Sequence, residues 1–90
     1  MGLKISADGT ETVVLPADNK EFTLDELYDL IGCSMVQMIY LPSGKTMWLD
    51  EEGKMKEGAM INEVATLKSG LYPHDVIVGN ALILEEGEIS

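Results

Sequence analysis

The sequence predicts a small α+β domain of the β-grasp, or ubiquitin-like, type, in which one main helix covers a mixed sheet. Three observations support this fold: two hairpin signals, a well-marked amphipathic helix between them, and a final stretch, 71–84, that is the longest apolar run. The predicted order is strand, strand, helix, strand, strand, short helix, strand. A strand that is apolar on both faces is usually central. We therefore expect the last strand to lie in mid-sheet beside the first and parallel to it.

The two hairpins are predicted over residues 3–15 and 35–49. In the first, Asp8-Gly9 separates two β-type runs, a strong signal for a tight turn. In the second, Pro42 and Gly44 suit a type I turn with a bulge. The first arm of this second hairpin is apolar at nearly every position, which indicates that it is covered on both faces.

The main helix is predicted over residues 24–31. Thr23 and Glu26 have the spacing of a capping box, in which each side chain bonds to the backbone N–H of the other residue. Gly32 is a suitable residue to end the helix. A shorter helix is predicted after Asn62, with Val64, Ala65 and Leu67 facing inward and Gly70 ending it.

The final stretch has two interpretations. Residues 75–84 either form one central strand or fold into a small hairpin with Gly79-Asn80 as its turn. In the first case Val76, Ile77 and Val78 lose contact with water, and Asn80 needs a partner for its amide. In the second case Asn80 is exposed.

Ninety residues correspond to one domain, here residues 1–90, with a core over 3–84 and a polar tail over 85–90. The lone Cys33 excludes an intrachain disulfide and a thiolate zinc site. Residues 1–4 contain no long apolar run, and no window reaches the length of a membrane span. These features favour a cytoplasmic protein.

The charge excludes some functions. Sixteen acidic residues and six Lys give a net charge of −10, and there is no Arg. Nucleic-acid binding requires clustered cations, and anionic membrane surfaces attract basic segments. We therefore expect neither direct nucleic-acid binding nor membrane binding, whereas a basic partner, a divalent cation or simple solubility remains compatible with the charge.

Three motifs carry a resemblance to a known family: Leu71-Tyr72-Pro73-x-Asp75-Val76-Ile77-Val78-Gly79-x-Ala81-Leu82, Phe22-Thr23-Leu24-x-Glu26-Leu27 and Ile39-Tyr40-Leu41-Pro42-x-Gly44. The chain resembles a family of small proteins of unknown function that are encoded mostly by bacteriophages, large viruses and bacterial mobile elements. The resemblance implies such an origin, and with it the host-cell cytosol as the compartment of a viral chain, but no activity and no catalytic residues. The chain departs from the family pattern at His74, where a small residue is more common, so a family-wide role for His74 is not expected.

Cys33 and His74 are the only candidates for a nucleophile and its base. Asp75 adjoins His74, but neighbours on a strand point to opposite faces, so Asp75 is badly placed to orient the ring. Cys33 follows the end of the main helix and fits a small, half-buried hydrophobic residue. We therefore expect no catalytic residues, no enzymatic activity and no cofactor.

Two groups of residues are candidates for binding. Asp50, Glu51, Glu52 and Glu57 form an acidic loop that could hold Ca²⁺ or Mg²⁺, although the spacing is not that of an EF-hand and solvated acids are the simpler interpretation. Partner-binding candidates are the acidic face of the main helix and two aromatic residues of the second hairpin: Asp25, Glu26, Asp29, Tyr40 and Trp48.

Two functions follow from these candidates. The first is a non-enzymatic acidic interaction module that binds a host or viral protein. The net charge and the acidic face of the main helix motivate this hypothesis. The alternative is a small-molecule or divalent-cation-binding domain, for which the acidic loop is the reason. The oligomeric state does not follow from the sequence.

Overall fold

The computed structural model describes residues 1–17, 20–85 and 87–89. The segment 17–21, which the sequence predicts as a polar connection between the first hairpin and the main helix, and the predicted polar tail (85–90) therefore lie partly outside the described residues. Within the described ranges the chain forms five strands, two α-helices and one 3₁₀ turn: β1 (Gly2–Ile5), β2 (Glu11–Val14), α1 (Leu24–Ile31), β3 (Val36–Tyr40), β4 (Thr46–Asp50), η1 (Gly53–Met55), α2 (Glu63–Ser69) and β5 (Ala81–Leu84).

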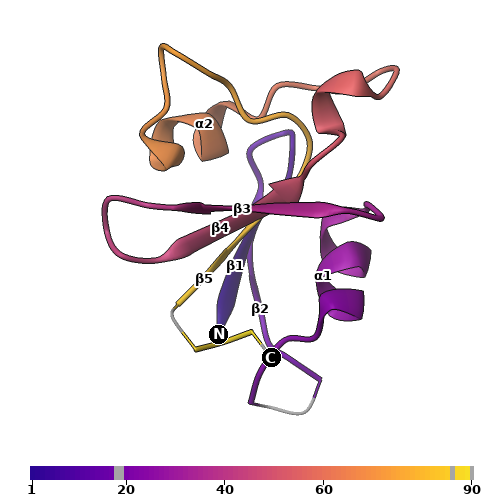
Figure 1. Cartoon of the computed structure of the whole chain (residues 1–90), viewed down its shortest axis with the longest axis vertical. Helices are drawn as coiled ribbons and strands as arrows, with labels where there is room; N and C mark the ends of the chain where they lie inside the picture. The colour runs from indigo at the N-terminus through magenta and orange to yellow at the C-terminus, as the bar shows by residue number, and fades with distance from the viewer. Residues whose placement is uncertain (18–19, 86, 90) are drawn as a thin grey trace.

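The strands form one sheet in the order β2-β1-β5-β4-β3 (Figure 1). The prediction that the last strand is central is confirmed. The prediction that it runs parallel to β1 is wrong, because Leu3 pairs with Ile83 in an antiparallel ladder and every other neighbouring pair is antiparallel as well. Residues 51–80 return the chain to the end of the sheet where β4 finished, so β5 runs back along β4. The fold is thus α+β, but its antiparallel sheet does not have the β-grasp arrangement.

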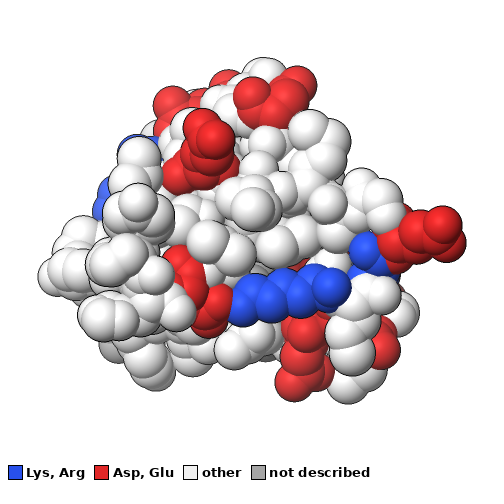
Figure 2. All heavy atoms as spheres, turned by 90° about the horizontal axis from the view of Figure 1, so that it is seen from above, with Lys and Arg blue, Asp and Glu red and all other residues white. Residues whose placement is uncertain are grey.

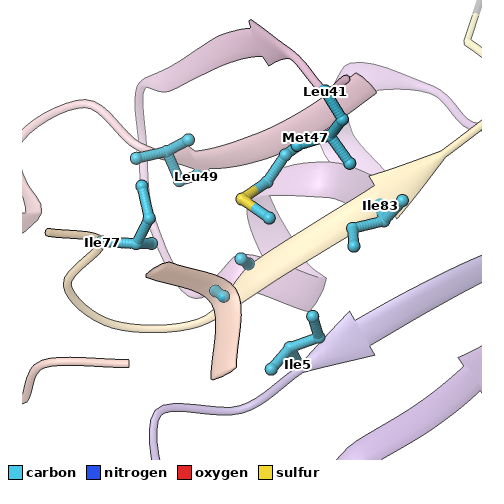
Figure 3. Close-up of a cluster of buried hydrophobic side chains, with 8 residues drawn as sticks. Ile5, Leu41, Met47, Leu49, Ile77 and Ile83 are labelled. Carbon is cyan, nitrogen blue, oxygen red and sulfur yellow. The ribbon is translucent and has the colours of Figure 1, made fainter. Parts of the chain in front are cut away.

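The sheet is covered on both faces (Figure 1). On one face, Phe22, Leu27 and Ile31 of the α1 region pack against Leu82 and Leu84. On the other face lie α2 and its flanking segments; we call residues 53–80 the upper layer. The upper layer contributes Ala65 and Ile77 to a buried hydrophobic cluster on this face of the sheet (Figure 3). The buried residues of the cluster are Ile5, Leu41, Met47, Leu49, Ala65, Ile77, Ala81 and Ile83. The prediction of a single covering helix was therefore incomplete.

The central strand is short and fully covered. All four residues of β5 are buried, because α1 covers one face and the upper layer the other. Residues 75–80 are neither strand nor hairpin: Gly79 takes a φ of +81°, and Val78 makes only an isolated bridge to Ile61. Asn80 is half-buried and has the partners that burial requires, since Oδ1 accepts from Ala7 N at 3.0 Å and Nδ2 donates to Ile31 O at 3.4 Å.

Local signals predicted the remaining elements well, with one exception. The Thr23–Glu26 capping box and the left-handed Gly32 confirm both ends of α1. Both hairpins are also confirmed. The predicted double burial of β3 is wrong, because β3 is an edge strand and its Tyr40 is 76% exposed.

The end of the chain differs from the predicted solvated tail. Phe22 N donates to Glu88 O at 2.6 Å, and Ile89 packs on the α1-side core. Glu85 is exposed as expected, but Glu88 is half-buried and pairs with the N-terminal ammonium of Met1. Residues 87–89 therefore fold back onto the α1 side of the sheet.

Candidate functional site

The upper layer is attached to the sheet by a buried amide. Asn62 is fully buried at the N-cap of α2, where Oδ1 accepts from Ala65 N at 3.0 Å. Its Nδ2 donates to Ile5 O and to Gly79 O, both at 2.9 Å. One side chain thus joins the start of α2, the end of β1 and the segment before β5, and its amide has a partner for each donor.

Two hydroxyl groups continue this polar attachment. Thr66 Oγ1 donates to Asn62 O at 2.7 Å and accepts from Ile77 N at 2.8 Å. Ser69 Oγ donates to Thr66 O at 2.6 Å and accepts from Leu71 N at 3.1 Å. Both residues are buried, so the inner face of α2 is largely polar and hydrogen-bonded.

This arrangement overturns the predicted inner face of α2. Ala65 is buried and Val64 half-buried, as expected, but Leu67 is 69% exposed. Because Asn62, Thr66 and Ser69 occupy the inward positions, the helix is rotated so that Leu67 points outward.

The outer surface of the upper layer is rich in large apolar side chains. Among the large hydrophobic residues that are exposed in the described chain, five lie in the upper layer: Met55, Met60, Ile61, Leu67 and Tyr72, with exposed fractions from 56% to 78%. Figure 2 looks onto this side from above and shows a broad area of uncharged residues with Asp, Glu and Lys side chains around it. We call these five residues the apolar outer surface.

Charge is divided between the upper layer and the rest of the chain. The upper layer, 53–80, contains three Lys and three acidic residues and so has no net charge. The other 62 residues contain three Lys and 13 acidic residues and carry the whole net charge of −10. The upper layer therefore has no net charge and, with 28 of the 90 residues, carries five of the eleven large apolar side chains that are exposed among the described residues.

The predicted acidic residues of α1 are divided between structural and exposed positions. Asp25 and Asp29 are exposed. Glu26 is half-buried and has a structural role, because its carboxylate accepts hydrogen bonds from Thr23 N at 3.1 Å and from Ala17 N at 2.9 Å. Asp25 and Asp29 thus remain as a small acidic surface on the far side of the sheet from the upper layer.

The two predicted aromatic residues lie apart from that acidic surface. Trp48 is half-buried in the α1-side core, and its Nε1 donates to Thr46 Oγ1 at 3.1 Å. Tyr40 is exposed at the end of β3 that is further from α1, because β3 starts beside the end of α1 and runs away from it (Figure 1). The five predicted partner-binding residues do not form one continuous surface.

The acidic loop is arranged around ion pairs. Lys56 Nζ lies 2.5 Å from Asp50 Oδ2, and Asp50 Oδ1 accepts from Glu52 N at 2.9 Å. The bond to Asp50 raises the pKa of the Lys56 ammonium. Glu51 and Glu57 are exposed, and within the described residues no three His, Cys, Asp or Glu side chains are placed to hold a metal ion.

Cys33 and His74 lie on opposite sides of the sheet. Cys33 packs with the α1-side core, where burial and then the charge of Asp50 raise the pKa of its thiol. His74 is exposed in the upper layer. Asp75 pairs with Lys54 and also accepts a hydrogen bond from Val76 N. Both interactions lower the pKa of the Asp75 carboxyl, and the one with Lys54 has the larger effect. The geometry therefore assembles no nucleophile–base pair from these residues.

The comparison with protein families matches residues 5–90 to the model of a domain of unknown function, DUF3846. The match covers nearly the whole chain, so the protein belongs to this family. Neither a curated protein nor a solved structure matches the chain. Across the described residues, the helices are too short and too polar to cross a lipid bilayer.

Proposed function

We propose that this member of the DUF3846 family is a non-enzymatic interaction module that binds a protein partner through its apolar outer surface. The single observation that carries the proposal is the segregation of the chain: five exposed large apolar residues lie on a segment with no net charge, while the rest carries −10. The surface differs from the one that the sequence predicted.

The composition of the apolar outer surface supports this role. Scattered single hydrophobic residues are normal on proteins, but several on one layer are characteristic of interaction sites. Met and Tyr are enriched in interface cores, where charged residues are depleted. Leu67 and Tyr72, 69% and 63% exposed, have the apolar area of interface anchors. Burying them against a partner removes this area from water.

The acidic remainder favours a partner with a basic surface. Charges outside an interface mainly steer encounter and accelerate association, and salt screens this effect. Asp25 and Asp29, which lie away from the upper layer, contribute in this way and not as contact residues. The affinity should therefore depend on the apolar outer surface, and the association rate on the net charge.

Origin and compartment enter the proposal through the family resemblance. We assign the protein to a phage or mobile element and place its partner, a host or viral protein, in the cytosol of the host cell. An acidic chain with a single half-buried Cys33 is compatible with that reducing compartment.

The test is affinity capture from host lysate at low and moderate salt, with the wild-type chain and two matched variants. Leu67→Asp places a charge within the apolar outer surface, and Tyr40→Asp places the same charge at an exposed apolar residue on β3. We expect the wild-type and Tyr40→Asp proteins to capture the same partner, and Leu67→Asp to lose it.

The reverse pattern, in which Tyr40→Asp loses the partner and Leu67→Asp keeps it, would assign binding to the β3 side and contradict the proposal. Capture of no protein at either salt concentration would also contradict it. Circular dichroism of both variants checks that each is folded, since both positions are exposed and tolerate substitution.

A further inference from the structure

A second feature lies on the same face of the sheet as the upper layer, beside the last turn of α2. It is an open cavity of about 480 Å³. Its floor includes a row of cross-strand partners, since Val13 pairs with Leu3 and Leu3 pairs with Ile83. Leu41 and Ile83, which border it, are visible at the edge of the core in Figure 3. The cavity is thus apolar at its base.

Two lysines stand at the rim of this cavity. Lys45 belongs to the turn between β3 and β4, and Lys68 to the last turn of α2. These elements meet beside the cavity, because a Cβ on Gly70 would lie only 3.4 Å from the ring of Pro42. The packing of α2 on the turn therefore brings two of the six Lys residues to one opening.

The two ammonium groups are loosely paired. Lys45 Nζ lies 3.9 Å from Glu85 Oε1, and Lys68 Nζ lies 3.6 Å from Glu11 Oε1. Charge-assisted N–H···O bonds are shorter, about 2.7–2.9 Å. Both lysine side chains are about half exposed, at 50% and 44%. They can turn toward another anion at little cost, since exposed ion pairs of this kind contribute little.

We propose that this cavity binds a small amphipathic carboxylate, with its hydrocarbon part on Leu3, Val13 and Ile83 and its carboxylate between Lys45 and Lys68. The volume lies within the range of about 300–1,000 Å³ that is common for small-molecule sites. An apolar lining with a few convergent polar groups is the usual form of such sites. The inference goes beyond the proposed function, because the cavity residues are separate from the apolar outer surface.

The test compares three amphiphiles with the same hydrocarbon chain, decanoate, decanol and decyltrimethylammonium, each below its micelle concentration. A net charge of −10 alone favours the cation. The cavity instead favours the anion, and we expect decanoate to bind about tenfold more tightly than decanol, as expected for two partly exposed ion contacts. Methyl-resolved NMR should show shifts at Leu3, Val13 and Ile83, and not at Val14 or Leu82 on the opposite face.

The double variant Lys45→Gln/Lys68→Gln should reduce the preference for decanoate to the level of decanol. Lys54→Gln is the matched control, because it removes an equally exposed lysine outside the cavity and should leave decanoate binding unchanged. Equal binding of decanoate and decanol, tighter binding of the cation, or methyl shifts confined to the upper layer would each overturn the proposal. None of these outcomes depends on the protein partner, so the two proposals can fail separately.

Discussion

The two helices begin alike but are held to the sheet by different forces. Each has a side-chain N-cap and a left-handed glycine after its last turn. The cap of α1, Thr23, is exposed, and the helix is held by buried Leu27 and Ile31. The cap of α2, Asn62, is fully buried and bonds to two other segments of the chain.

This difference determines which side chains are left for binding. A helix that is held by apolar packing must turn its apolar stripe inward. A helix that is held by buried hydrogen bonds can keep large apolar residues on its outer side, as α2 does with Leu67. The polar attachment of α2 is therefore the structural reason that Leu67 lies on the apolar outer surface.

The largest expected difference in stability is between alanine substitutions of Leu27 on α1 and Leu67 on α2. Leu27→Ala should lower the free energy of unfolding by about 2–5 kcal/mol, because Leu27 is fully buried. Leu67→Ala should change it by less than about 0.5 kcal/mol, because Leu67 is 69% exposed and Ala is at least as good a helix former. Denaturant unfolding measures both values, and similar losses would contradict the assigned orientation of α2.

Thr66 tests whether hydrogen bonds or methyl packing hold the upper layer. Thr66→Val keeps the shape but leaves Ile77 N without its acceptor, and should cost about 1–3 kcal/mol. Thr66→Ser keeps the hydroxyl and loses one methyl group, at about 0.8 kcal/mol. If the Ser variant proves less stable than the Val variant by urea denaturation, apolar packing and not hydrogen bonding attaches α2.

The smallest expected effect is the pH dependence of stability that comes from Cys33, which lies on the α1 side of the sheet. Burial and the charge of Asp50 raise its thiol pKa in the folded protein, so the folded state holds this proton more tightly than the unfolded state. Its contribution to stability is present below the unfolded thiol pKa and is lost as the pH rises through the folded pKa. The alkylation rate should reach its midpoint at a higher pH in folded than in urea-unfolded protein. The Asp50→Asn substitution should reduce the difference in midpoint pH between the folded and the unfolded protein. A midpoint that is lower in the folded protein than in the unfolded protein would contradict a raised thiol pKa.

The sequence predicted the elements whose signals are local. The bounds of α1 follow from Thr23, Glu26 and Gly32, which lie within ten residues of each other, and both hairpins follow from their turn residues. The central place of β5 was also predicted, because a run of apolar residues favours a strand that is covered on both faces. The same pattern misled the prediction for β3, which is an edge strand.

Features that depend on distant segments were missed. The direction of β5 depends on the path of residues 51–80, which the local signals for α2 do not determine. The orientation of α2 was predicted wrongly because apolar periodicity cannot reveal a buried polar face formed by Asn62, Thr66 and Ser69. The exposure of Leu67 was missed for the same reason, whereas Met60-Ile61 in an otherwise polar stretch were a usable signal for the apolar outer surface.

The most direct test of the polar attachment compares the two N-caps. Thr23→Ala removes an exposed cap and should lower the free energy of unfolding by about 1 kcal/mol. Asn62→Ala removes a cap of the same kind and also leaves Ile5 O and Gly79 O without their donor, at about 1–3 kcal/mol for each buried group. Denaturant unfolding of both variants should therefore show Asn62→Ala to be the less stable by about 2 kcal/mol or more. Equal losses would mean that Asn62 acts only as a helix cap and would contradict the account.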